Sequence, residues 1–345
     1  MKILLSGGGT LGSIGPLLAV LPKLLKEQNQ VFFVGTYHGV EKKLVSQEKI
    51  IFYAMLAPKL RRYFTWRYLF FPLEVFISFF QALVVLLKNR PQVIVSAGGF
   101  VSVPLVWVGW LLRIPALIHQ QDLQPGLANK LMAPLAVKIT VAFPESLAYF
   151  PKKKTTWIGN PVRDLTPTTD NIALDKSVPT VFIMGGGTGA CAINALVTPE
   201  ICTFCNVIHM TGENRARKLS VIHHPRYHQY AFLQAEMKEA LQKAEVVVSR
   251  AGLGSISELA ALAKPALIIP IPHSHQEKNA DFLKTHQAAI ILNQEKLTAQ
   301  IFCQEIKSLL FNLQKKDILA KNISALSQKN ATFQFYQKIT SFKKI

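Results

Sequence analysis

The sequence predicts an α/β protein with two domains, each built on a parallel sheet with helices on its faces. Two observations predict this fold class. Short apolar runs alternate with segments that can form helices along most of the chain, which is typical of parallel sheets. A glycine cluster follows an apolar run near the start of each half, at Gly7–Gly9 and at Gly185–Gly187. Because 345 residues suffice for two domains, we expect two Rossmann-like domains that face a deep, shared cleft.

The expected elements alternate in the same order in both halves. In the first half, the expected strands are Ile3–Ser6, Gln30–Val34, Val93–Ser96, Ala116–His119 and Val137–Val141, and the expected helices are Pro16–Glu27 and Val103–Leu112. In the second half, the expected strands are Thr180–Met184, Asn206–Met210, Glu245–Ser249 and Ala266–Pro270, and the expected helices are Ser255–Ala263 and Asn279–His286. This alternation predicts parallel strands joined by helices.

The composition changes between the two halves. Residues 164–177 are rich in Thr, Pro, Asp and Asn, as a linker is. We therefore expect an N-terminal domain over residues 1–162, a linker over 163–178 and a C-terminal domain over 179–328. The tail over 329–345 is polar and basic, and we expect it to end as a helix.

Composition restricts the partners and the compartment. The 39 Lys and Arg residues outnumber the 20 Asp and Glu residues, which favours an anionic partner: nucleic acid, anionic lipid or a phosphorylated substrate. The four cysteines do not form a disulfide framework, and Cys202-x-x-Cys205 has no second pair with which to hold a metal, so we expect ordinary buried thiols. Met1-Lys2 leads directly into the first strand without a cleavable signal, so we expect a cytoplasmic chain.

The segment Leu69–Leu87 is almost wholly apolar and has basic residues on both sides. It is long enough to span a membrane, but a span would place parts of one sheet on opposite sides of the bilayer. A buried core helix is a second interpretation. We favour a partly exposed apolar patch with a basic rim that docks on an anionic membrane surface. The candidate insertion residues are Phe76, Phe79, Phe80, Leu83, Trp107 and Trp110.

The glycine clusters suit tight turns from a strand into a helix. Such turns need φ values that a Cβ opposes, and the free N–H groups of the following helix favour a phosphate or diphosphate. Gly7-x-Gly9-x-x-Gly12 also matches the dinucleotide pattern, but the second strand ends in Val34–Tyr37 without the acidic residue that NAD requires. Neither loop ends in Gly-Lys-Ser/Thr, so a P-loop ATPase is excluded. A tight turn without a ligand is the alternative interpretation.

The segment Ser249–Glu258 is a stronger candidate for a nucleotide site. It runs from a strand through a glycine loop into a helix. Glu258 would lie in the first turns of that helix and accept hydrogen bonds from both ribose hydroxyls, while the helix N-terminus faces the diphosphate. A solvated or capping carboxylate is the alternative role for Glu258. The polar residues of Pro272–Ala280 would emerge at the same sheet edge, where a sugar can be held.

These residues together resemble the MurG family of N-acetylglucosaminyltransferases, in glycosyltransferase family 28. The resemblance covers nearly the whole chain and consists of seven motifs in the family order. They are Gly7–Pro16, Ser96–Val103, His119–Lys130, Gly159–Arg163, Gly185–Ala190, Ser249–Glu258 and His275–Ala280. The resemblance implies the GT-B fold, with a C-terminal helix that returns to the N-terminal domain.

The resemblance also implies roles for individual residues around a UDP-sugar. Arg163 aligns with an Arg at the nucleotide site, Leu233 would present its backbone to uracil, and Glu258 would hold the ribose. Thr10, Leu11 and Gly12 would lie near the diphosphate and the acceptor. The remaining donor-site positions are Asp122, Gly187, Thr188, Leu253, Gly254, Ser255, Ile256, Ser257, His275 and Gln276.

Three motifs depart from the family pattern. Ser13 stands where the family has a His in the first loop, and a serine hydroxyl is no general base without a neighbour that takes its proton. The family His-Glu-Gln-Asn is His119-Gln120-Gln121-Asp122 here. In the second loop, Gly187 replaces a family Ser, and Thr188 is the substitute donor.

An imidazole is thus lost from one loop and a carboxylate is gained in another, so we hypothesise that Asp122 is the catalytic base, with Ser13 the other candidate catalytic position. In the alternative interpretation, Asp122 is not a base and only forms a hydrogen bond with a sugar hydroxyl, as the family Asn does. His119 is a weaker candidate base, because a His at a strand end is often structural.

The implied reaction is an inverting transfer of GlcNAc from UDP-GlcNAc to the C4 hydroxyl of undecaprenyl-diphosphate-MurNAc-pentapeptide. Without an Asp-x-Asp pair we expect no metal and no cofactor, and we expect no nucleic-acid partner. The expected location is the cytoplasmic face of the bacterial plasma membrane, through contacts with anionic inner-leaflet lipids. A GT-B enzyme that acts on another lipid, such as diacylglycerol, and an inactive membrane-docked homologue are the alternatives.

Overall fold

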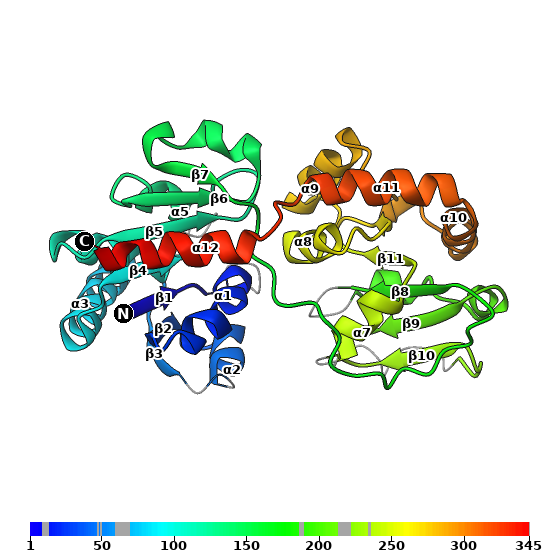
Figure 1. Cartoon of the computed structure of the whole chain (residues 1–345), viewed down its shortest axis with the longest axis horizontal. Helices are drawn as coiled ribbons and strands as arrows, with labels where there is room; N and C mark the ends of the chain where they lie inside the picture. The colour runs from blue at the N-terminus through cyan, green and yellow to red at the C-terminus, as the bar shows by residue number, and fades with distance from the viewer. Residues whose placement is uncertain are drawn as a thin grey trace. The chain divides into compact units, whose positions relative to one another are not determined.

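The structure is a computed structural model that describes residues 1–8, 14–46, 48, 50–58, 70–185, 190–212, 222–233 and 236–344. The chain forms two compact units (Figure 1). Unit 1 comprises Met1–Arg163 and Gln328–Ile345, and unit 2 comprises Asp164–Ser327. Each unit is an α/β domain with its own core, and each is described by itself.

The described part of unit 1 contains a seven-stranded parallel sheet in the order β3-β2-β1-β4-β5-β6-β7. The strands are β1 (Lys2–Ser6), β2 (Gln30–Thr36), β3 (Ile51–Met55), β4 (Val93–Ser96), β5 (Ala116–Gln120), β6 (Lys138–Val141) and β7 (Thr155–Trp157). Successive strands are added towards one edge of the sheet from β1 to β3 and towards the other edge from β4 to β7, so the strand order reverses between β1 and β4. Ligands of open α/β sheets bind outside the carboxyl ends of the strands at such a switch point.

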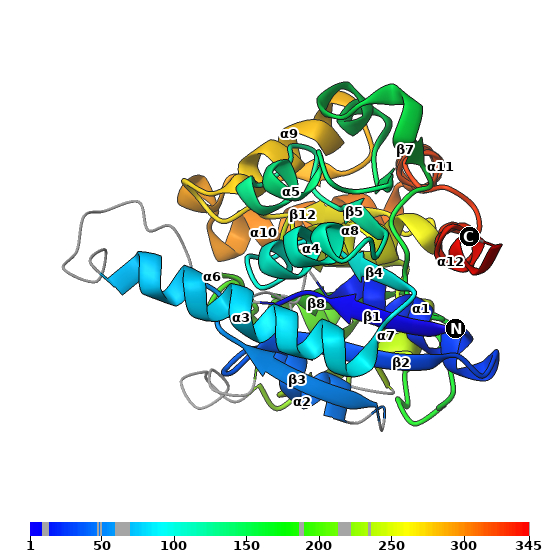
Figure 2. The same cartoon turned by 90° about the vertical axis from the view of Figure 1, so that its left-hand side faces the viewer.

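Helices cover both faces of this sheet. On one face, α1 (Gly15–Lys26) and α12 (Ala331–Thr340) pack over β1 and β4. On the other face, α3 (Phe71–Asn89), α4 (Ser102–Leu111) and α5 (Leu127–Met132) share a second apolar cluster with the sheet (Figure 2). The short helix α2 (Val40–Ser46) lies between β2 and β3 in the chain. The final helix of the chain therefore completes the core of the unit in which the chain begins.

Within the described residues, unit 2 contains a six-stranded parallel sheet in the order β10-β9-β8-β11-β12-β13. The strands are β8 (Thr180–Met184), β9 (Asn206–Met210), β10 (Tyr227–Tyr230), β11 (Val246–Ser249), β12 (Ala266–Ile268) and β13 (Ile290–Ile291). The helices are α6 (Cys191–Asn194), α7 (Glu236–Lys243), α8 (Leu253–Ala261), α9 (His275–Thr285), α10 (Ala299–Phe311) and α11 (Leu313–Ala325).

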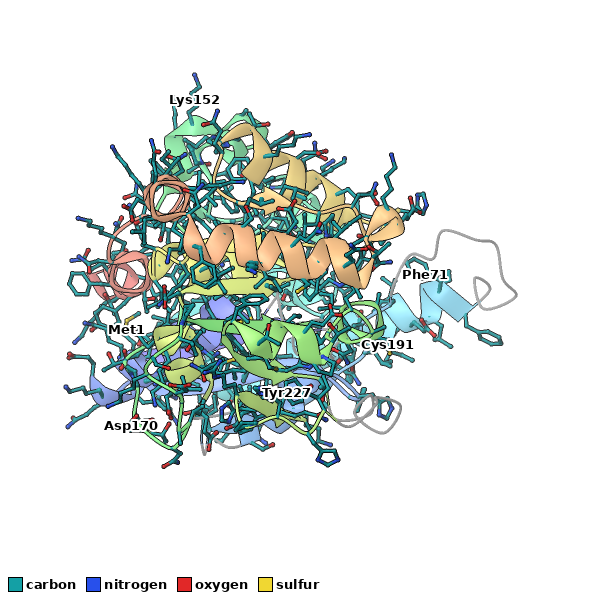
Figure 3. The ribbon with its side chains drawn as sticks, turned by 90° about the vertical axis from the view of Figure 1, so that its right-hand side faces the viewer. Met1, Phe71, Lys152, Asp170, Cys191 and Tyr227 are labelled. Carbon is teal, nitrogen blue, oxygen red and sulfur yellow. The ribbon has the colours of Figure 1, made fainter. Side chains whose placement is uncertain are left out.

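The segment that we expect to be a linker, residues 163–178, has no helix or strand but is attached to unit 2. Glu239 of α7 accepts hydrogen bonds from the Thr169 hydroxyl at 2.7 Å, from the Asn171 N–H at 3.0 Å and from the Ile172 N–H at 2.7 Å. Burial opposes ionisation of Glu239, but these bonds and the Lys243 ammonium outweigh it and lower the pKa of the carboxyl to about 2. Lys243 also binds Asp170, which is labelled at the edge of unit 2 in Figure 3.

Candidate active site at the carboxyl edges of the two sheets

The loops after β1 and β4 contact each other through their backbones at the carboxyl edge of unit 1. Gly98 and Gly99 have φ values of +104° and +92°, which favour glycine. A Cβ on Gly99 would lie 2.8 Å from the carbonyl oxygen of Gly8. The Ser96 hydroxyl accepts a hydrogen bond from the Gly98 N–H at 3.0 Å and fixes the turn. The loop after β4 therefore requires glycine at position 99, because the loop after β1 lies against it.

A buried carboxylate lies beside the first glycine loop. Glu41, in the first turn of α2, has no solvent exposure, and its Oε1 accepts hydrogen bonds from the Thr36 N–H at 2.8 Å and hydroxyl at 2.6 Å. A Cβ on Gly8 would lie 2.5 Å from that oxygen. Gly8 thus makes room for a carboxylate, a packing reason that the phosphate interpretation of this loop does not contain.

The turn after β5 carries Asp122, whose side chain is exposed. The buried side chain of Gln120 forms hydrogen bonds with the backbone of this turn. The Gln120 amide donates to the carbonyl oxygens of Asp122 at 2.7 Å and of Gln124 at 3.2 Å. Ser146 donates to the carbonyl oxygen of Leu123 at 2.9 Å. The structure therefore displays a carboxylate on a firmly held turn at the same sheet edge.

His119, at the end of β5, is fully buried and is not placed to act as a base. Its Nε2 lies 3.1 Å from Oδ1 of Asn160, and its Nδ1 lies 3.0 Å from the hydroxyl oxygen of Thr140. Burial lowers the pKa of His119 to about 4, and the bond to Asn160 only partly opposes this. His119 therefore joins β5 to the segment that contains Gly159 and Asn160, as a neutral structural histidine.

At the carboxyl edge of unit 2, the chain passes from β11 through Arg250, Ala251 and Gly252 into α8. Gly252 is the extended N-cap residue and provides no side-chain hydrogen bond to the helix, and the N-terminus of a helix favours an anion. Glu258 is half-buried in the second turn of this helix. Of the other predicted α8 positions, Gly254 is exposed, Ser255 is half-buried, and Leu253, Ile256 and Ser257 are buried.

Two buried polar side chains that sequence reasoning missed fix this loop. The Arg250 guanidinium donates to the carbonyl oxygens of Ile269 at 3.0 Å and Pro270 at 3.2 Å, just beyond β12. Asn279 of α9 donates to the carbonyl oxygen of Ala251 at 2.9 Å. A charged residue directly before a glycine loop was the available signal for Arg250. Together they place the ends of β11 and β12 and the start of α9 at one edge.

The remaining predicted site residues belong to both units of the chain. Gln276, at the start of α9, accepts the Ile271 N–H through Oε1 at 3.2 Å, so its side chain shapes the turn that precedes the helix. Leu233 is buried in the loop after β10. Arg163 is exposed at the last position of the first segment of unit 1. Thr10, Leu11, Gly12, Ser13, Gly187, Thr188 and the side chain of His275 lie outside the described residues.

A second buried histidine supports the segment after β8. His209 on β9 lies 3.1 Å from Oδ1 of Asn194 in α6 and 2.8 Å from the hydroxyl of Tyr227, which Figure 3 labels on the sheet side of unit 2. Burial lowers the pKa of His209 to about 4. Asn194 in turn donates to the carbonyl oxygen of Thr211 at 2.9 Å. This neutral network fixes the helix that follows the second glycine cluster.

Helix α3 is long and apolar enough to cross a membrane, with a mean hydropathy of 1.8, yet only 22% of its apolar window is buried. Both of its ends connect to strands of one sheet, and one side packs on α4 (Figure 2), so it does not span a bilayer while the sheet is intact. Its outer side exposes large apolar side chains. With the adjoining end of α4 they form the α3–α4 apolar surface: Leu73, Phe76, Phe80, Val84, Leu87, Trp107, Trp110 and Leu111.

Two of the predicted insertion residues do not belong to this surface. Phe79 and Leu83 are half-buried and pack against the core of unit 1. The correction follows from the helical period, because positions 79 and 83 lie on the side of α3 that faces the sheet and α4.

Two α/β domains with parallel sheets, each with a glycine-rich loop at the carboxyl edge of its sheet, form the fold of GT-B glycosyltransferases, and the family matches assign the chain to this class. Residues 3–141 match the glycosyltransferase family 28 N-terminal domain, and residues 180–335 match the corresponding C-terminal domain. The chain belongs to glycosyltransferase family 28.

Relatives and solved structures agree with this membership. The chain is 35% identical over 327 residues to a UDP-N-acetylglucosamine--N-acetylmuramyl-(pentapeptide) pyrophosphoryl-undecaprenol N-acetylglucosamine transferase of Lachnospira eligens, covering 89% of this chain and 90% of the relative. It is 33% identical over 343 residues to the transferase of the same name from Clostridium tetani, covering 95% and 94%. The crystal structure of Acinetobacter baumannii MurG superposes with a TM-score of 0.76 at 25% identity, over 100% of this chain and 99% of that one.

Proposed function

We propose that this chain transfers GlcNAc from UDP-GlcNAc to the C4 hydroxyl of undecaprenyl-diphosphate-linked MurNAc-pentapeptide. The observation that carries the proposal is the similarity to transferases named for this reaction, at 33–35% identity over about nine-tenths of both chains. The placement of the residues supports it. Gly252 leads into α8 without a side-chain cap, Glu258 is half-buried in the second turn of α8, and Asp122 is exposed.

The donor half of the proposal rests on unit 2. The open N-terminus of α8 binds the diphosphate of UDP, and Glu258 accepts the two ribose hydroxyls. The backbone near Leu233 contacts uracil, and His275 and Gln276 contact the sugar. Arg250 holds the loop in shape from inside the protein. Arg163 is the proposed cation at the nucleotide.

The chemical step is a single displacement with inversion at the anomeric carbon. The acceptor C4 oxygen forms a bond to C1 of GlcNAc as the bond from C1 to the UDP oxygen breaks. The Asp122 carboxylate takes the proton of the C4 hydroxyl, and the negative charge that develops on UDP is stabilised at the N-terminus of α8. No metal or cofactor takes part in this proposal.

The α3–α4 apolar surface is the proposed membrane contact. Its aromatic side chains would enter the interface of the bilayer, and Lys88 and Arg90 at the end of α3 lie next to the acidic headgroups. Because the proposed acceptor is a lipid, a peripheral position on the cytoplasmic leaflet brings the site to its substrate.

A transferase assay tests the proposal. The purified full chain is incubated with UDP-GlcNAc and a lipid-linked MurNAc-pentapeptide analogue, and with UDP-GlcNAc and diacylglycerol in parallel. Formation of the β-1,4-linked disaccharide on the first acceptor only is the expected result. Transfer to diacylglycerol only would identify a different lipid glycosyltransferase. Binding of UDP-GlcNAc without any product would identify an inactive homologue.

A further inference from the structure

We propose that Gln120 positions the catalytic carboxylate of Asp122, and that its side chain must be an amide to do so. This inference rests on the proposed role of Asp122 as the base. Gln120 is the last residue of β5 and has 1% exposure. It acts through the backbone of the turn that carries Asp122.

Both polar atoms of the Gln120 side chain form hydrogen bonds. One hydrogen of Nε2 is donated to the Asp122 carbonyl oxygen at 2.7 Å and the other to the Gln124 carbonyl oxygen at 3.2 Å. Oε1 accepts a hydrogen bond from Asn129 Nδ2 at 2.6 Å. The partners also fix which way the amide points, because two carbonyl oxygens on one side require the NH₂ group there.

Neighbouring side chains complete the support of this turn. Asn129, on α5, also donates to the carbonyl oxygen of His119 at 3.3 Å, so it links the helix to the strand on which Gln120 lies. The Ser146 hydroxyl lies 3.3 Å from the carbonyl oxygen of Asp122 and 2.9 Å from that of Leu123. The backbone of residue 122 is thereby fixed while its side chain stays exposed. A carboxylate held in this way needs little ordering before it meets an acceptor hydroxyl.

A carboxylate at position 120 could not replace the amide. Gln and Glu have nearly the same shape, but an ionised Glu is only an acceptor and would face two carbonyl oxygens without a hydrogen to donate. The two carbonyl oxygens would lose their hydrogen bonds from the side chain at 120, and a buried charge would stand two residues from Asp122. An amide at 120 and a carboxylate at 122 are therefore parts of one arrangement.

A double-mutant cycle tests the proposal, with kcat, the KM for UDP-GlcNAc and thermal unfolding measured for each variant. We expect Gln120→Glu and the uncharged Gln120→Met to lower kcat about 10- to 100-fold, because both remove the two donors that hold the turn. The KM for UDP-GlcNAc should stay within about twofold, since the donor-binding loop belongs to unit 2. In an Asp122→Asn background, the same substitutions at 120 should lower kcat little further.

Gln124→Glu is the matched control. It places the same charge on the same turn, but on an exposed side chain. Gln120 bonds to the backbone oxygen of Gln124, so this substitution breaks none of the hydrogen bonds from Gln120. Its loss of kcat should be clearly smaller than that of Gln120→Glu. If the variants at 120 unfold, Gln120→Asn, which keeps the amide and shortens its reach, takes their place in the cycle.

The outcomes separate the inference from the function on which it rests. If the substitutions at 120 lower kcat by the same factor with and without Asp122, Gln120 does not act through Asp122 and the inference is wrong, while the base role stands. If Asp122→Asn keeps full turnover, the base role and the inference are both wrong, although the wild-type chain still makes product. If the wild-type chain makes no disaccharide, the proposed function itself is wrong.

Discussion

At the scale of single residues, the close contact between the loops after β1 and β4 explains why glycine is needed at position 99. Gly99→Ala combines a left-handed φ of +92° with a Cβ 2.8 Å from the backbone oxygen of Gly8. Because each of the two loops directly follows a strand of the sheet, neither backbone can shift without displacing that strand. We therefore expect the free energy of unfolding of unit 1 to fall by about 2–4 kcal/mol. Gly15→Ala, at the start of α1, is the control, because no neighbour among the described residues lies within 4 Å of its added Cβ, and a gain of about 0.5 kcal/mol is expected. Urea denaturation measures both, and equal effects would contradict the clash.

The two buried histidines predict how stability responds to acid. Burial lowers the pKa of His119 and of His209 from 6.5 to about 4, so in the folded protein both are neutral at pH 5. The unfolded chain binds protons there that the folded chain does not, so stability is lost as the pH falls from 6.5 towards 4. The full loss is about 3 kcal/mol for each site. Denaturation at a series of pH values should show a flatter acid limb for His119→Gln in unit 1 than for the wild type, whereas an unchanged slope would contradict the argument.

At the scale of elements, α3 tests the membrane proposal. Phe76→Glu with Phe80→Glu places charges on the most exposed side chains of its outer face, which are 70% and 60% exposed. We expect binding to vesicles of phosphatidylglycerol and phosphatidylethanolamine to weaken at least about tenfold, because two aromatic side chains no longer enter the interface. Leu313→Glu, on an exposed apolar side chain of unit 2, is the control and should leave vesicle binding unchanged. Vesicle flotation measures both. Equal weakening by the control would indicate a different docking surface.

The sequence predicted the central strands of both sheets but missed their edges. The four missed strands, β3, β7, β10 and β13, are the outer strands of the two sheets. A central parallel strand is covered on both faces and is a continuous apolar run, as in Val246–Ser249. An edge strand such as Tyr227–Tyr230 is half-exposed and polar, so no apolar run marks it. A similar limit applies to the candidate site. Sequence motifs mark positions such as Asp122 and Glu258, whereas Gln120, Glu41 and Asn279 act through contacts that only the folded register creates.

The segment that joins the two units gives a prediction about α7. Glu239→Ala removes the acceptor of the Asn171 and Ile172 N–H groups and of the Thr169 hydroxyl. We expect faster cleavage of residues 164–178 by a nonspecific protease, because the segment loses its attachment to unit 2. Asp170→Ala removes only an exposed ion pair with Lys243 and should change the rate little. Limited proteolysis of the folded chain compares them. Cleavage at the wild-type rate in Glu239→Ala would show that other contacts hold the segment.

At the scale of the whole molecule, the chain ends by completing the domain in which it started. Phe335 and Ile339 of α12 have no solvent exposure and pack with β1, β4 and α1. The Phe335 ring lies 5.2 Å from the His119 ring, and Gly159, with φ +78°, lies so close to Gln328 that a Cβ there would be 2.7 Å from that of Gln328. The returning segment therefore packs on the same His119–Asn160 connection that ends β5, the strand that carries Gln120.

Removing one aromatic ring from α12 should consequently affect unit 1 alone. Phe335→Ala creates a cavity in a fully buried cluster, which typically costs about 3–5 kcal/mol. Because unit 2 begins at Asp164 and ends at Ser327, it contains none of that cluster. Amide hydrogen exchange should become faster in β1, β4 and β5 and stay unchanged in β8 and β11. Leu319→Ala, a buried residue of α11, is the reciprocal variant and should speed exchange in β8 and β11 only. Faster exchange in both units of either variant would show that the two domains unfold as one, so that α12 stabilises the whole chain rather than the domain that it completes.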